Sequence, residues 1–132
     1  MLMTMDKTTL AGRRLLLVED EAMVAMMVED MLSELGCVVV GVAGTVSRGL
    51  ALADDPDLRI DGAVLDINLG GETVYPVADA LKARGVPFIF STGYSTAGVK
   101  ADYTNVPILA KPYQQDTLAE RLTLALDGGG PH

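Results

Sequence analysis

Short apolar runs alternate with helix-like stretches five times along the chain, and this alternation restricts the fold more than any other feature. The runs cover residues 15–18, 37–43, 60–65, 86–90 and 106–110. The first run, Leu-Leu-Leu-Val, is apolar at every position, which is typical of a strand buried on both faces of a parallel sheet. The repeated alternation predicts an α/β fold in which a doubly wound, five-stranded parallel sheet carries helices on both faces.

The stretches between the runs have the period of amphipathic helices. Residues 22–35 place Met23, Met27 and Met31 in one row along a helix. At this spacing we expect Met23, Met26 and Met27 to belong to the core; the alternative is an adaptable surface for a partner protein. Further helices are expected at residues 46–54, between Pro76 and Gly85, and after Pro112.

Charge and rare residues exclude several functional classes. Among 132 residues, 18 are acidic and 10 basic, and the net charge of −8 argues against a nucleic-acid-binding surface. The single cysteine, Cys37, and the single histidine, His132, leave no basis for a disulfide, a cysteine-based metal cluster or a Ser-His-Asp triad. No apolar run approaches the length of a membrane span, and no signal peptide is recognisable, so we expect a cytoplasmic protein without membrane insertion.

The length of the chain accommodates one domain. We expect a flexible N-terminal segment at residues 1–12 and the folded domain at residues 13–126. A Gly-rich C-terminal tail at residues 127–132 contains no core-forming residues.

Charged and hydroxyl side chains follow four of the five predicted strands. They are Glu19 and Asp20, then Asp66, then Ser91 and Thr92, and finally Lys111. Each has an ordinary explanation by itself: an acid after a strand often caps the next helix, and a lysine before a proline is usually a solvated loop residue. Because the carboxyl ends of parallel strands meet at one edge of a sheet, where ligands bind, their combination predicts a functional site.

The chemistry of this set points to phosphoryl transfer. Three carboxylates that lie close together repel one another, and a divalent cation relieves that repulsion. Oxygen ligands without His or Cys favour Mg²⁺, with Mn²⁺ as an alternative. A lysine and a hydroxyl can bind phosphoryl oxygens, and Asp66 can act as the nucleophile that forms an aspartyl phosphate.

With these residues in order, the chain resembles the receiver domain of two-component response regulators, a CheY-like family. The resemblance covers residues 13–126 and implies a parallel sheet of strand order 2-1-3-4-5. It implies that Asp66 is the phosphoacceptor and that Mg²⁺ is held by Glu19 (through water), by Asp20 and Asp66, and by the backbone carbonyl of Asn68. It further implies that Lys111 and Thr92 bind the phosphoryl group, and that the bond between Lys111 and Pro112 is cis.

One departure indicates a subgroup. Most receivers carry an aromatic switch residue three positions before the lysine, where this chain has Ile108. The residues Phe-Ser-Thr-Gly-Tyr at 90–94 are instead similar to a single-domain subgroup marked by Phe-Ala-Thr-Gly-Tyr ("FAT GUY"), which implies a histidine kinase partner of the HWE/HisKA2 type. Gly93 and Tyr94 then belong to the switch. We expect residues 94–103 to be loosely ordered until Asp66 is phosphorylated, and we expect Tyr94 to slow dephosphorylation.

The resulting prediction is a stand-alone receiver that takes a phosphoryl group from a histidine kinase or a phosphotransfer protein. It signals through partner binding or serves as a relay or sink for phosphate, and it is not an enzyme in the turnover sense. We expect a monomer or a weak dimer. Two alternatives remain: an Asp-nucleophile phosphatase or phosphotransferase of the haloacid dehalogenase type, and a pseudo-receiver that binds partners without being phosphorylated.

Overall fold

The computed structural model describes residues 10–93, 99 and 101–127, and its main sheet has five strands. These are β1 (Arg14–Val18), β2 (Val38–Ala43), β3 (Gly62–Asp66), β6 (Phe88–Thr92) and β7 (Ile108–Ala110). The α-helices are α2 (Ala22–Glu34), α3 (Val46–Ala53), α4 (Tyr75–Ala83) and α5 (Gln115–Asp127). A short hairpin, β4 (Asn68–Leu69) and β5 (Glu72–Thr73), follows β3, and a 3₁₀ turn, η2 (Ala101–Tyr103), precedes β7.

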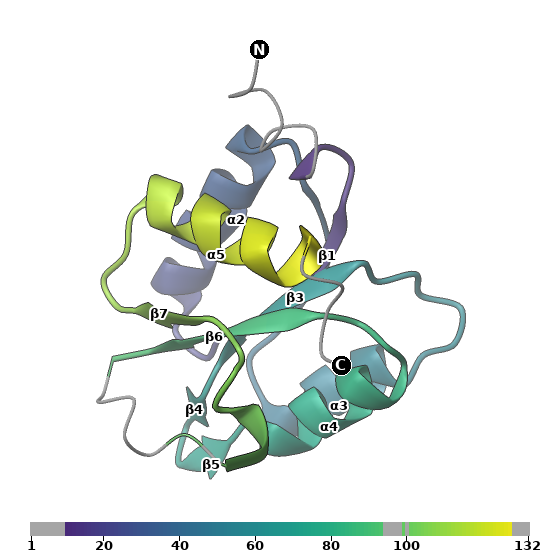
Figure 1. The fold of residues 1–132 in the computed structure, drawn as a ribbon. Coiled ribbons are helices and arrows are strands. Elements are labelled where there is room, and N and C mark those ends of the chain that lie inside the picture. Colours follow the sequence, from purple (N-terminus) through teal and green to yellow (C-terminus); the bar gives the residue numbers. More distant parts are fainter. Residues whose placement is uncertain (1–9, 94–98, 100, 128–132) are drawn as a thin grey trace.

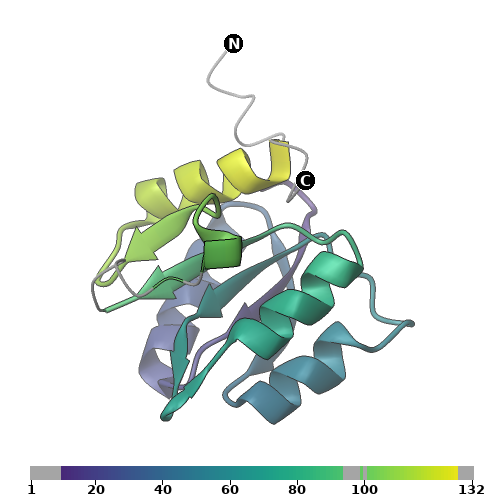
Figure 2. The ribbon, with the colours of Figure 1, turned by 60° about the horizontal axis from the view of Figure 1, so that its bottom comes forward.

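The sheet has the order β2-β1-β3-β6-β7, and every neighbouring pair of its strands is parallel. Numbered along the main sheet, this is the order 2-1-3-4-5, so the predicted fold is confirmed. Helices α2 and α5 cover one face of the sheet, and α3 and α4 cover the other (Figures 1 and 2). The three layers leave the carboxyl ends of the strands open at one edge, where the predicted site lies.

Side chains of the central strands alternate between two cores. Leu15 and Leu17 of β1 point to the core under α2 and α5, whereas Leu16 and Val18 point to the core under α3 and α4. All four are at most 1% exposed, which confirms that β1 is buried on both faces. This arrangement fixes the register of β1, because a slip of one residue would exchange the two faces.

Three methionines of α2 do not enter the core, and that expectation was wrong for them, whereas Met31 is partly buried against it. Met23, Met26 and Met27 are 84%, 65% and 44% exposed. The helix rests on the sheet through Ala25, Val28 and Leu32 instead. Residues at this spacing form one stripe of a helix, and its position leaves these three methionines facing outward.

The N-terminal boundary also differs from the expectation. Leu10, which we assigned to the flexible segment at residues 1–12, is 1% exposed and packs in the core under α2 and α5. The buried thiol of Cys37 donates a hydrogen bond to the Leu10 carbonyl at 3.4 Å. The packed part of the chain therefore includes Leu10. Within the described residues, no helix combines the length and the apolar character that crossing a membrane requires.

Candidate functional site

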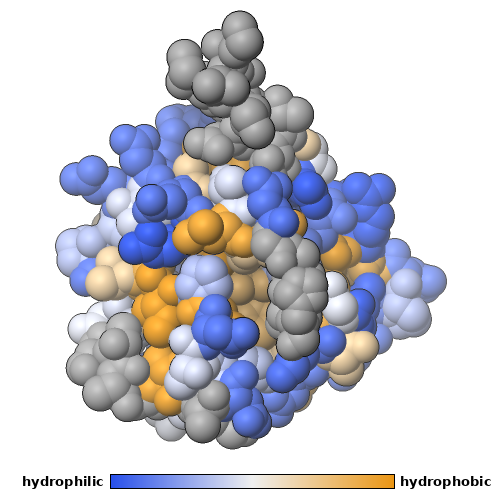
Figure 3. Space-filling model, viewed as in Figure 1, coloured by the Kyte–Doolittle hydropathy of each residue, from blue (hydrophilic) through white to orange (hydrophobic). Residues whose placement is uncertain are grey.

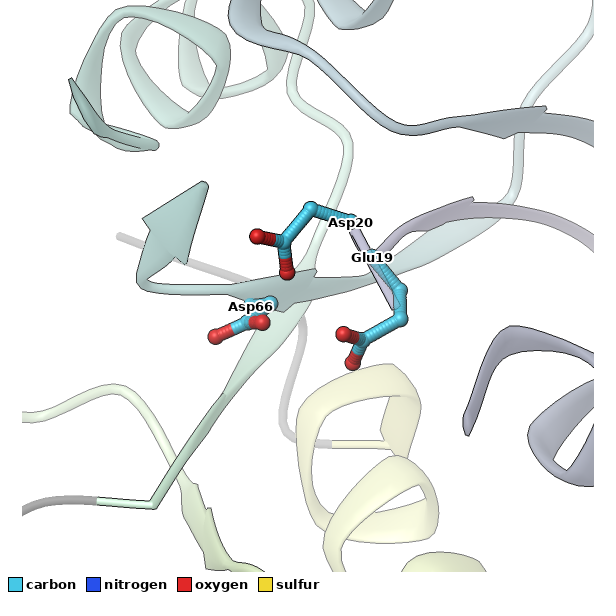
Figure 4. Close-up of side chains that lie close together, drawn as sticks. All are labelled: Glu19, Asp20 and Asp66. Atoms are coloured by element: carbon cyan, nitrogen blue, oxygen red, sulfur yellow. The ribbon is translucent and has the colours of Figure 1, made fainter. Parts of the chain in front are cut away.

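Three carboxylates meet at the carboxyl edge of the sheet. Glu19 and Asp20 follow β1, and Asp66 is the last residue of the neighbouring strand β3. One carboxylate oxygen of each residue lies within 4.8 Å of those of the other two, and the three side chains lie close together (Figure 4). Glu19 and Asp66 are 3% and 5% exposed, whereas Asp20 is exposed.

The backbone explains why these carboxylates lie at the same level. Val18 pairs with Leu65 across the parallel strands, so the following residues, Glu19 and Asp66, lie side by side at the carboxyl ends of β1 and β3. The Glu19 N–H donates to the carbonyl of Ala43 at 2.9 Å and continues the ladder with β2 by one residue. Helix α2 begins beyond them; the side chain of its N-cap residue, Glu21, makes no capping hydrogen bond, and the Glu21 N–H donates to Glu19 Oε2 at 3.1 Å.

Lys111, which directly follows the edge strand β7, extends its side chain to the acidic cluster. Its Nζ lies 2.8 Å from Glu19 Oε1 and 3.0 Å from Asp66 Oδ2, and its side chain is only 16% exposed. A third carboxylate, that of exposed Glu21, lies 3.8 Å from the same ammonium. Lys111 is therefore a partner of the acidic cluster and not a solvated loop residue.

Burial and pairing act on the pKa values of this cluster in opposite ways. Burial raises the pKa of Glu19 above its ordinary value of 4.5, and the hydrogen bond from Lys111 offsets only part of that rise. Burial lowers the pKa of Lys111, but its hydrogen bonds to Glu19 and Asp66 outweigh burial and hold the pKa above the ordinary 10.5. One ammonium thus faces a group of carboxylates that it cannot fully neutralise.

The β4–β5 hairpin forms one wall of the site, where the sequence predicted only a loop. The Gly70 N–H donates to Asp20 Oδ2 at 2.9 Å, and the Asn68 N–H donates to Asp66 Oδ1 at 3.2 Å. Gly70 and Gly71 form its two-residue turn with φ values of +56° and +94°. Two glycines in succession are a signal for such a turn, so the hairpin could have been predicted from the sequence.

The predicted switch residues lie at the same edge as far as the structure describes them. Thr92 is 3% exposed at the end of β6, and its carbonyl accepts the Lys111 N–H at 2.8 Å. Gly93 is exposed and helps to line the open depression above the carboxylates. The Lys111–Pro112 bond is cis, as the resemblance implied. Tyr94, and with it most of the segment 94–103 for which we predicted loose order, lies outside the described residues.

An aromatic residue that we did not assign to the site fills the core behind Thr92. Tyr103 of η2 is 2% exposed, and its ring lies 5.6 Å from that of Phe90 and 5.8 Å, nearly parallel, from that of Tyr75. Its hydroxyl donates to Asp79 Oδ1 of α4. Ile108, which pairs with Phe90 across β6 and β7, is partly buried against the same core. The chain therefore supplies an inward aromatic from η2 and not from position 108.

The donor set fits a hard divalent cation. Glu19, Asp20 and Asp66 offer oxygen atoms and no nitrogen or sulfur, which suits Mg²⁺ or Mn²⁺. The depression beside them is open to solvent and is also lined by the small residues Gly70, Gly71 and Gly93. A cation and a phosphoryl group could therefore approach Asp66 from outside.

Comparison with known proteins identifies the same family. The model of the response regulator receiver domain matches residues 15–123. The phyllosphere-induced regulator PhyR of Methylorubrum extorquens is 33% identical over 116 residues, which cover 85% of this chain and 43% of PhyR. The transcriptional regulatory protein PdtaR of Mycobacterium tuberculosis is 27% identical over 129 residues, which cover 93% of this chain and 61% of PdtaR.

A solved structure gives a more similar relative of comparable length. The solution structure of SdrG from Sphingomonas melonis Fr1 is 44% identical, with a TM-score of 0.75, and covers 85% of this chain and 94% of SdrG. The chain thus matches almost the whole length of SdrG but spans less than two thirds of either regulator named above.

Proposed function

The chain belongs to the response regulator receiver domain family, and from that membership we propose that it accepts a phosphoryl group from a histidine kinase on Asp66. Members of this family are signalling proteins. The observation that carries the proposal is the contact of Lys111 Nζ with Asp66 Oδ2 at 3.0 Å, inside a cluster where Glu19 and Asp20 lie within 4.8 Å of Asp66. Nucleophile, cation ligands and ammonium, from three different strand ends, are the parts that such a transfer requires.

In this reaction a carboxylate oxygen of Asp66 attacks the phosphorus atom of a phosphohistidine. The bond between phosphorus and oxygen forms, and the imidazole nitrogen leaves with the electron pair of the bond that breaks. Asp20, Asp66 and the Asn68 carbonyl, with Glu19 through water, would hold Mg²⁺, which would supply positive charge beside the phosphoryl oxygens. Lys111 exchanges its contact with Asp66 for a contact with one phosphoryl oxygen. The Thr92 hydroxyl donates a hydrogen bond to a second phosphoryl oxygen.

The subgroup of the chain and the type of its kinase partner are further parts of this proposal. We place the chain in the Phe-Ala-Thr-Gly-Tyr subgroup, with a cytoplasmic kinase partner of the HWE/HisKA2 type, because Ser-Thr-Gly-Tyr follows Phe90. A structure of SdrG in a conformation activated by BeF₃ is also among the similar structures, at 44% identity and a TM-score of 0.74. The exposed Met23, Met26 and Met27 lie on α2, which begins next to the site, and they provide an adaptable surface for that partner.

Intact mass measurement tests the proposal. The full chain is incubated with acetyl phosphate, with and without Mg²⁺, beside the variants Asp66→Asn and Asp30→Asn. Asp30 is an exposed acid of α2 and provides a control with the same change of charge. We expect one phosphoryl adduct that requires Mg²⁺, that forms in the wild type and in Asp30→Asn, and that is absent in Asp66→Asn.

An adduct that persists in Asp66→Asn would contradict the assignment of the phosphoacceptor. A folded wild-type chain that gains no mass, from acetyl phosphate or from a phosphorylated kinase of the proposed type, would contradict the function and favour the pseudo-receiver. The decay rate of the adduct then separates the roles, since slow decay favours an effector and fast decay a phosphate sink.

A further inference from the structure

The β4–β5 hairpin is tied firmly to the sheet beside the acidic cluster. The Ile67 N–H donates to the Ser91 carbonyl at 3.0 Å, and the Val74 N–H donates to the Ile67 carbonyl at 2.9 Å. Leu69, in the first strand of the hairpin, is 4% exposed, and Val74, just after the second, is fully buried. These contacts therefore fix the position of the Gly70–Gly71 turn relative to Asp66.

The amide at the tip of this hairpin points at a carboxylate from another strand. The Gly70 N–H donates to Asp20 Oδ2 at 2.9 Å, across 50 residues of sequence. Asp20 is exposed and follows the end of β1, so few contacts of its own would restrict the rotation of its carboxyl group. A hydrogen bond from a backbone group in a fixed turn restricts that rotation.

We propose that the Gly70 amide is a positioning group for the metal site, which holds the Asp20 carboxylate in the orientation that binds Mg²⁺. This inference rests on the proposed function, because it assigns a role in the metal site of the receiver. Groups that orient metal ligands lower the cost of assembling the site, and their removal typically weakens metal binding about 10- to 100-fold. The hairpin acts on two ligands at once, since it also carries Asn68.

Conformation, and not lack of space, demands glycine in this turn. A Cβ atom at position 70 or 71 would meet no heavy atom within 4 Å, but φ is +56° at Gly70 and +94° at Gly71. A two-residue turn with positive φ at both positions favours Asn and Gly. Gly70→Asn therefore keeps the amide and the turn, whereas Gly70→Pro removes the N–H group that donates to Asp20 and, because proline fixes φ at about −65°, also disrupts the turn.

Titration of the full chain with Mg²⁺ tests this role without any phosphorylation. We expect Gly70→Pro to raise the Kd for Mg²⁺ about tenfold, and Gly70→Asn to leave it within about twofold of the wild type. The Kd is measured by calorimetry and by amide chemical shifts. A wild-type chain that binds no Mg²⁺ would overturn the proposed function together with this inference. A wild type that binds, with an equal Kd in Gly70→Pro, would overturn the inference alone.

Hydrogen exchange of the Gly70 amide gives a second test that does not depend on how Gly70→Pro folds. We expect this amide to be protected in the wild type, to remain protected when Mg²⁺ is bound, and to lose its protection in Asp20→Ala. Exchange that accelerates to the rate of an open loop on Mg²⁺ binding would overturn the inference, because the amide would then not hold Asp20 in the metal-bound site.

Discussion

Replacement of Lys111 by methionine should expose how strongly the site depends on one ammonium group. The change keeps most of the aliphatic side chain but removes the charge that lies 2.8 Å from Glu19 and 3.0 Å from Asp66. Both carboxylates are at most 5% exposed, so neither can recover full hydration. At an effective dielectric constant of about 20, each contact corresponds to roughly 5–6 kcal/mol of Coulomb attraction, much of which desolvation offsets.

The net effect on stability is smaller than that attraction and still large. Removal of one partner from a buried ion pair costs about 3–5 kcal/mol, because the remaining charge stays buried. Since the Lys111 side chain is 16% exposed and the depression beside it is open, we expect the lower end of that range, about 3 kcal/mol. That is a large share of the free energy of unfolding of a domain, which is about 5–15 kcal/mol.

Urea unfolding at pH 7 without divalent cations measures the loss. Lys82→Met is the matched control, because it makes the same change of charge at a lysine whose Nζ lies 5.4 Å from the centre of the Tyr103 ring. It should cost at most about 1 kcal/mol. Adding Glu19→Gln to Lys111→Met should restore part of the stability by removing one unpaired carboxylate. If Lys111→Met costs no more than Lys82→Met, the two carboxylates do not depend on Lys111 and the reasoning is refuted.

Three further predictions concern groups that are not members of the acidic cluster. Tyr103→Phe should lower the free energy of unfolding by about 1 kcal/mol, because it removes one hydrogen bond to Asp79. Tyr103→Ala should lower it by about 3–5 kcal/mol, because it also removes a ring from the aromatic core. Equal losses of the two variants in urea unfolding would contradict this. The Tyr113 hydroxyl is buried without a hydrogen-bond partner among the described residues, so Tyr113→Phe should raise the free energy of unfolding by about 1 kcal/mol, and a decrease would disprove that view. Burial raises the pKa of the Cys37 thiol from 9.0 to about 11, so its contribution to stability is complete below pH 9 and is lost as pH rises to 11. Cys37→Ala should therefore lose less stability than the wild type over that range, by an amount on the order of 2 kcal/mol, and parallel pH profiles would rule this out.

Lys111 and Tyr103 show two different relations between sequence and site. Lys111 follows a recognisable strand and could be assigned to the site in advance, because the end of a parallel strand has a known place in the fold. Tyr103 lies in a segment with little periodicity, and its burial depends on Tyr75 and Phe90, which belong to distant elements. The burial of Tyr103 could not be predicted from a local sequence pattern, because the aromatic rings that it packs against belong to distant segments of the chain.

The methionines of α2 illustrate the same limit for a regular helix. The period of residues 22–35 predicted a helix correctly, but it allowed more than one apolar stripe, because methionine, valine and alanine alternate around it. Which stripe faces inward was decided by the shape of the sheet, which accepts Ala25, Val28 and Leu32. The hairpin at Gly70 and Gly71 is different, because two successive glycines are a local signal for its turn and could have predicted it.

By itself, the sequence determined the class of fold, the order of its elements and the set of polar residues at the strand ends. These properties depend on local periodicity and on the rule that parallel strands share one carboxyl edge, and both can be read along the chain. Only the tertiary structure decided that Lys111 joins Glu19 to Asp66, that the Gly70 N–H bonds to Asp20, and that Met23, Met26 and Met27 face outward. Those outcomes depend on distances between segments far apart in sequence, which packing of the whole domain sets.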